Sequence, residues 1–124
     1  MQNAHEAYSK TAKLASKPRQ LEASLLLKAA SQLQDIHDSW PGDRDALHAV
    51  LTYNQRLWTV FVGAVAEDDS PLPQEIRDNV ASLGVFIFKH TLEIQQDPAP
   101  EKLLALININ KEIATGLRAN TSAH

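Results

Sequence analysis

The sequence contains no cysteine, which excludes disulfide bonds, thiol catalysis and thiolate metal sites. Its longest nearly apolar run, Leu57 to Ala66, is about half as long as a membrane-spanning helix needs to be. The first residues lack a basic stretch followed by an apolar one, so we expect no secretory signal. The net charge of −3 argues against a general nucleic-acid binder. These absences together fit a cytoplasmic protein that does not cross a membrane.

The 124 residues that are present suffice for one domain with its own hydrophobic core. Apolar residues recur every three or four positions in each long segment, which is typical of amphipathic helices. Val85 to Phe88 resembles a strand, but no second strand is available to pair with it. We therefore predict an all-α, single-domain helical bundle over residues 1–124, with four main helices and a lighter N-terminal helix. The expected helices cover about 3–15, 18–38, from an N-cap at Asp43 to near Glu67, 73–96 and 101–118.

The two ends of the chain differ from the rest in their patterning. Residues 1–16 have only a thin apolar edge, so we expect this segment either to dock lightly or to be mobile until a partner binds. Residues 119–124 are expected to form a frayed tail. The bundle proper therefore starts near Pro18.

The stretch from Leu47 to Val65 is apolar on nearly all sides, so we expect other helices to surround it. In the helix before it, Leu21 is expected on the buried stripe. In the helix after it, Gly84 costs about 1 kcal/mol relative to alanine. Close approach of another helix is the usual compensation, and we expect Trp58 or Phe61 to fill that space.

Several apolar side chains lie outside the stripes that a small bundle would bury. This excess indicates either a binding groove or oligomer surface, or a place that the fifth helix covers. The residues are Leu26, Leu27, Phe86, Phe88, Leu104 and Ile109.

Three asparagines lie on or beside apolar stripes: Asn54 and Asn110 on them, and Asn79 next to one. A buried asparagine must be hydrogen-bonded. One interpretation is that these side chains bond between helices and fix their register, as polar residues do in coiled coils. The other is that they hold the backbone of a bound peptide.

Residues with catalytic or metal-binding chemistry form no recognisable motif. No two histidines are four positions apart, so the helical zinc pair is absent. His90 and Glu93 are one turn apart, which suits a surface pair. There is no nucleophile elbow, phosphate-binding loop or dinucleotide fingerprint. We therefore expect no enzymatic activity, no catalytic residues, no metal and no cofactor.

Short segments along nearly the whole chain, about residues 4–118, resemble the FlaF family of bacterial flagellar biosynthesis regulators. Each segment is short and mostly apolar, and their order and spacing carry the likeness. The segments are 16–23, 25–30, Tyr53–Thr59, Pro71–Pro73, Ile76–Arg77, Asn79, Leu83–Gly84, His90–Thr91, Leu106–Asn110, Ile113–Ala114 and Gly116–Leu117.

This resemblance implies a small cytoplasmic protein, without catalytic residues, that is needed to make and export flagellin, acting with a partner regulator, FlbT. The first hypothesis is a flagellin chaperone, because the terminal segments of flagellin are amphipathic and disordered before assembly. An apolar groove would hold such a segment as a helix. We expect the contact near the central and fourth helices, at Tyr53, Arg56, Trp58, Phe86 and Phe88.

The second hypothesis is a post-transcriptional regulator of flagellin synthesis. It would act through flagellin mRNA, or through FlbT. The phosphate contacts would come from the basic residues near the N-terminus, although the net acidity makes a nucleic-acid partner the less favoured one. These residues are Lys10, Lys13, Lys17, Arg19 and Lys28. The sequence does not indicate an oligomeric state.

Overall fold

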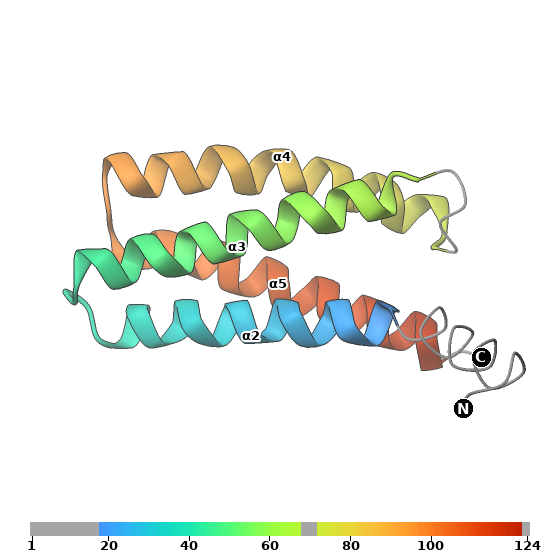
Figure 1. Cartoon of the computed structure of the whole chain (residues 1–124), viewed down its shortest axis with the longest axis horizontal. Coiled ribbons are helices and arrows are strands. Elements are labelled where there is room, and N and C mark those ends of the chain that lie inside the picture. The colour runs from blue at the N-terminus through green and yellow to red at the C-terminus, as the bar shows by residue number, and fades with distance from the viewer. Residues whose placement is uncertain (1–17, 68–71, 123–124) are drawn as a thin grey trace, which may run out of the picture.

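The computed structural model describes residues 18–67 and 72–122. These residues form four antiparallel helices in sequence order, α2 (Pro18–Asp38), α3 (Arg44–Val65), α4 (Gln74–Gln96) and α5 (Pro100–Ser122), as Figure 1 shows. The predicted all-α bundle of four main helices is confirmed. The lighter helix expected over 3–15 lies outside the described residues, as do residues 123–124. Within the described ranges, no helix is both long and apolar enough to cross a membrane.

The ends of α3 are held by specific polar contacts. Asp43 is the N-cap, as predicted, and its carboxylate accepts a hydrogen bond from the backbone N–H of Asp45 at 2.9 Å. At the other end, Arg77 of α4 donates to the carbonyl oxygens of Val65 and Glu67 at 3.0 and 2.9 Å. A cation among the last carbonyl groups of a helix is favourable, so Arg77 ties the two helices together.

The predicted end of α5 was wrong. Residues 119–122, expected to fray, continue the helix to Ser122. No proline follows Gly116, and Leu117 is buried in the core, so the last turns start from an anchored position.

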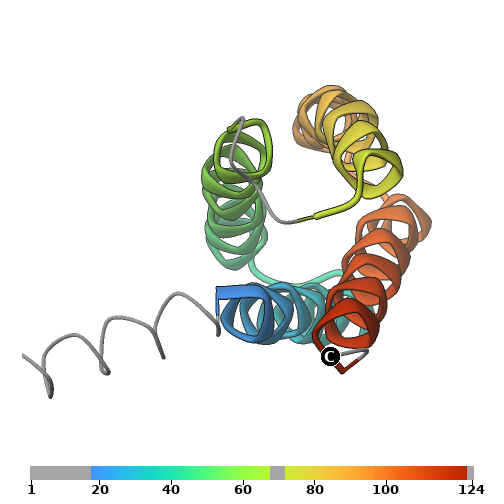
Figure 2. The ribbon, with the colours of Figure 1, turned by 90° about the vertical axis from the view of Figure 1, so that its right-hand side faces the viewer.

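The core runs along the bundle axis, which points at the viewer in Figure 2. There α2 and α5 lie side by side, and they make the closest helix pair of the bundle. Small buried residues, Ala23, Ala30 and Ala114, allow this approach because helix spacing follows side-chain size. The central helix buries six residues: Leu47, Leu51, Asn54, Trp58, Phe61 and Val65.

The contact at Gly84 is close, as predicted, but its partner differs. A Cβ atom on Gly84 would lie 2.7 Å from Cγ2 of Val62. Trp58 and Phe61 point into the core instead, where their rings pack edge to face with centroids 5.5 Å apart. The prediction that Trp58 or Phe61 fills the space beside Gly84 was therefore wrong. Val62 follows Phe61 by 100° around α3, which turns it from the core towards α4.

The apolar excess predicted from the sequence is only partly present. Leu26 is fully buried, and Leu27, Phe88 and Ile109 pack partly against the core. Phe86 and Leu104 are exposed. Other large apolar side chains are also exposed: Leu21, Val60, Val85 and Leu92.

Candidate functional site

The outer face shared by α2 and α3 is set in register by a contact at its middle. The Lys28 ammonium lies over the Tyr53 ring, 5.7 Å from the ring centroid. This is within the range of a cation–π interaction. Because the two helices are antiparallel, each step back along α2 from Lys28 matches a step forward along α3 from Tyr53.

An apolar end of this face lies two helical turns from that contact. Seven residues back along α2 is Leu21, and seven residues forward along α3 is Val60, so the two lie at the same end of the face, where the two helices diverge (Figures 1 and 2). Their side chains are 61% and 72% exposed, the highest values among the large apolar residues that the structure describes. Leu25 and Leu57 lie half-buried one turn nearer the middle. Two aliphatic side chains on each helix thus line this end of the face, and we call these four residues the aliphatic strip.

A hollow occupies the other end of the same face. It has a volume of about 380 Å³ and lies between the C-terminal half of α2 and the first turns of α3. Its lining is mixed: Gln32, Asp35, Ile36, Ala49, Val50 and Tyr53. The aliphatic strip, the Lys28–Tyr53 contact and this hollow together make up what we call the α2–α3 face.

The charges on the α2–α3 face are ordered along it. Lys28 and Arg56 are exposed near its middle, and Arg56 is one turn from both Tyr53 and Val60. Neither cation is in an ion pair with any residue that the structure describes. Asp35 lies at the far end. The middle of the face is therefore positive and the strip beside it uncharged.

The five residues predicted to bind a partner do not form one surface. Tyr53 and Arg56 lie on the α2–α3 face. Trp58 is fully buried and cannot contact a partner in this conformation, so its assignment to a surface was wrong. It lies on the one stripe of α3 that faces the axis of the bundle, two turns from Leu51 and one from Phe61.

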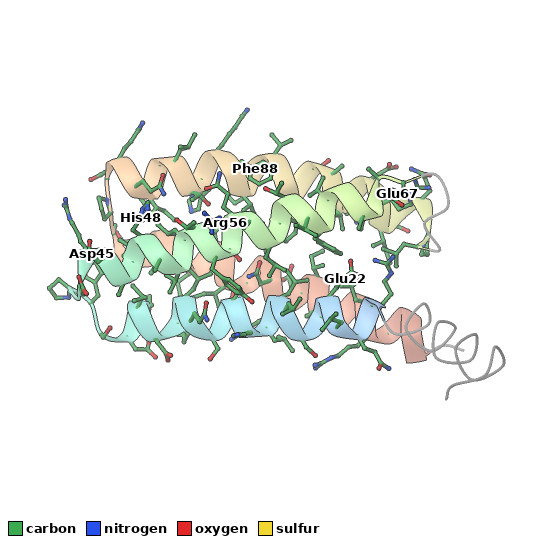
Figure 3. All side chains as sticks on the ribbon, in the orientation of Figure 1. Glu22, Asp45, His48, Arg56, Glu67 and Phe88 are labelled. Carbon is green, nitrogen blue, oxygen red and sulfur yellow. The ribbon has the colours of Figure 1, made fainter. Side chains whose placement is uncertain are left out.

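Phe86 and Phe88 are two positions apart in α4, so they point to opposite sides of that helix. Phe88, which Figure 3 shows on α4 together with Arg56 on α3, is half-buried against the core. Phe86 is exposed, and its ring stacks on His90 at a centroid distance of 5.0 Å. His90 in turn donates from Nε2 to the carbonyl oxygen of Lys102 in α5 at 2.8 Å. Phe86 therefore lies towards α5, away from the α2–α3 face.

Leu21 and Val60 are the residues of the face that the sequence interpretation missed. Leu21 was expected on the buried stripe of its helix, which was wrong because α2 buries Ala23, Leu26, Ala30 and Leu33 instead. Leu21 and Ala23 are two positions apart and so face different sides. The alternating spacing of three and four along Ala23, Leu26, Ala30 and Leu33 is the signal that distinguishes the two stripes.

The buried asparagines connect α3 to α5. Asn110 accepts a hydrogen bond from the indole Nε1 of Trp58 at 2.8 Å and donates one to Oδ1 of Asn54 at 2.7 Å. All three side chains are fully buried, which favours the register interpretation over contact with a bound peptide. The prediction was wrong for Asn79, which is exposed because it precedes the buried Val80 and so points about 100° away from it.

Within residues 18–67 and 72–122, no cluster of three histidine or acidic side chains could hold a metal ion. A second hollow of about 410 Å³ lies at one end of the bundle, near Arg44, His48 and Pro98. Its polar side chains are exposed, so water solvates them. The α2–α3 face is the more distinctive feature.

Comparison with known protein families gives a match over most of the chain. The model of the family described as flagellar protein FlaF matches residues 4–117. No curated protein and no solved structure matches the chain. Because the family match spans nearly the whole sequence, this chain belongs to the FlaF family of flagellar proteins.

Proposed function

We propose that this flagellar protein binds unpolymerised flagellin without enzymatic chemistry, accompanies it to export and so takes part in controlling its production. The observation that carries the proposal is the exposed aliphatic strip at Leu21, Leu25, Leu57 and Val60. Leu57 packs partly against the core, but Leu21, Leu25 and Val60 do not belong to the core cluster, which other buried side chains fill. An exposed strip of this kind suits an amphipathic helix from a partner.

Flagellin segments that are disordered before assembly fit this role. Such a segment would lay its apolar side on the protein and be kept from aggregating until export. Ordering it costs free energy, so the affinity is expected to be modest. The proposal places the protein in the cytoplasm, where flagellin is made.

Calorimetric titration with purified unpolymerised flagellin at low and high salt tests the proposal. We expect a dissociation constant of roughly 1 μM or below, with a negative heat-capacity change, because apolar surface is buried. Salt should change the affinity by only about a few-fold, since exposed ion pairs contribute little.

Absence of binding would contradict the proposal and would favour FlbT or flagellin mRNA as the partner. An RNA complex would have the opposite signature, because phosphate contacts weaken steeply with salt. Of the basic residues expected to make such contacts, Arg19 already pairs with Glu22 and Lys28 lies over Tyr53. Lys10, Lys13 and Lys17 lie outside the described residues.

A further inference from the structure

We infer that the α2–α3 face is the flagellin site and that it takes an amphipathic helix of about four turns with an acidic side chain near its middle. The inference rests on the proposed function and adds where the partner lies and which chemistry it presents. It is carried by the order of apolar, cationic and hollow regions along one face.

The length of the occupant follows from the length of the face. Leu21 and Ile36 are fifteen positions apart in α2, which at 1.5 Å per residue corresponds to about 22 Å. A helix of about fifteen residues matches this length. Its apolar positions would recur every three or four residues, as helices bound in grooves present them.

The charge of the occupant follows from the middle of the face. Lys28 and Arg56 are exposed there, each within about one helical turn of the nearest residue of the aliphatic strip. A carboxylate about two turns along the bound helix would lie between the two cations. Beyond it, the hollow of about 380 Å³ would receive a large side chain.

The same charges disfavour the segment of this chain that precedes α2. Residues 1–17 carry three lysines and one glutamate, so the segment is basic. A basic helix on the face would bring like charges against Lys28 and Arg56. The complementary occupant is therefore an acidic partner helix.

The test compares Val60→Asp with Leu92→Asp in the full chain, titrated with unpolymerised flagellin. Both side chains are more than half exposed, at 72% and 55%, so both variants should fold, which circular dichroism checks. Leu92 is on α4, away from the α2–α3 face. We expect Val60→Asp to weaken binding by roughly tenfold or more, because it places a carboxylate on an apolar contact, and Leu92→Asp by less than about twofold.

A second pair isolates the charge. Lys28→Glu and Lys89→Glu make the same change of net charge, on the α2–α3 face and on α4 respectively, and both positions are exposed. Lys28→Glu should weaken binding by roughly three- to tenfold, and Lys89→Glu should leave it nearly unchanged.

The outcomes distinguish failure of the proposed function from failure of the proposed location of the site. If the unaltered chain does not bind flagellin, the proposed function and this inference both fail. If it binds and the Val60 and Leu92 variants behave alike, only the location on the α2–α3 face is overturned. If light scattering shows that Val60→Asp converts a dimer of the free protein to a monomer, the face is a contact between copies, which also overturns the inference.

Discussion

At the scale of single residues, three side chains form a hydrogen-bonded chain in the core: Trp58, Asn110 and Asn54. The side chain of Asn110 accepts one hydrogen bond and donates another. The Nδ2 group of Asn54, in contrast, has no hydrogen-bond partner among the described residues. The two asparagines therefore do not contribute equally. Asn110 is the central member, because both hydrogen bonds pass through it.

Replacing either asparagine with leucine should reveal this difference. Asn110→Leu leaves the Trp58 N–H and the Asn54 oxygen buried without partners, so we expect it to lower the free energy of unfolding by about 2–4 kcal/mol. Asn54→Leu removes an unsatisfied amide together with one hydrogen bond, so we expect a loss of about 1 kcal/mol. Urea unfolding measures both variants. Equal losses in the free energy of unfolding would contradict the conclusion that Asn110 contributes more than Asn54.

Glu22 gives a prediction about pH. Its side chain is only 16% exposed, and burial raises the pKa of this carboxyl above its ordinary value of 4.5, although the Arg19 guanidinium partly opposes the shift. A carboxyl with a raised pKa binds its proton more tightly in the folded than in the unfolded protein. Its contribution therefore destabilises the fold as the pH rises from 4.5 through the raised value.

Glu22→Gln removes this titration while keeping the shape of the side chain. We expect the variant to lose less stability than the unaltered chain between pH 4.5 and neutrality. Asp38 does not interfere in this range, because hydrogen bonds from His37 and Gln34 lower the pKa of its carboxyl from an ordinary value of 3.8. Urea unfolding at several pH values measures the slope, and parallel curves for the two proteins would exclude the role given to Glu22.

At the scale of helices, the spacing of apolar residues was enough to place all four described elements and the N-cap at Asp43. It was not enough to decide which side chain meets which across two helices. Val62, not Trp58 or Phe61, lies against Gly84, because that choice depends on how α3 and α4 are rotated about their axes. Helix rotation is set by the packing of the whole core, which no local pattern contains.

The contact between Val62 and Gly84 predicts a non-additive pair of substitutions. Gly84→Ala alone places a methyl group 2.7 Å from Cγ2 of Val62, so we expect a loss of about 1–2 kcal/mol despite the better helix propensity of alanine. In a Val62→Ala background the obstructing methyl is gone. There Gly84→Ala should be neutral or stabilising by up to about 1 kcal/mol.

A double-mutant cycle measured by thermal or urea unfolding tests whether the Val62 and Gly84 substitutions are non-additive. The cycle requires the two single variants, the double variant and the unaltered chain. Additive effects would show that α3 and α4 are not held together at this contact.

At the scale of the whole molecule, the candidate site could be predicted only in part. Tyr53 and Arg56 were identified from the sequence and lie on the α2–α3 face, but Leu21 and Val60 were not identified as its apolar end. They come from segments almost forty residues apart, and they reach the same end of the face because α2 and α3 are antiparallel neighbours. The predicted set, taken from the central and fourth helices, therefore combined side chains that the fold directs to different sides.

The measurement that tests the central claim most directly is a methyl NMR spectrum of the isotopically labelled chain, recorded with and without unpolymerised flagellin. Leucine and valine methyl groups report on each face of the bundle separately. The account predicts shifted or broadened signals from Leu21, Leu25, Leu57 and Val60, with those of Val85 and Leu92 unchanged. Changes confined to Val85 and Leu92, or no changes at all, would contradict it.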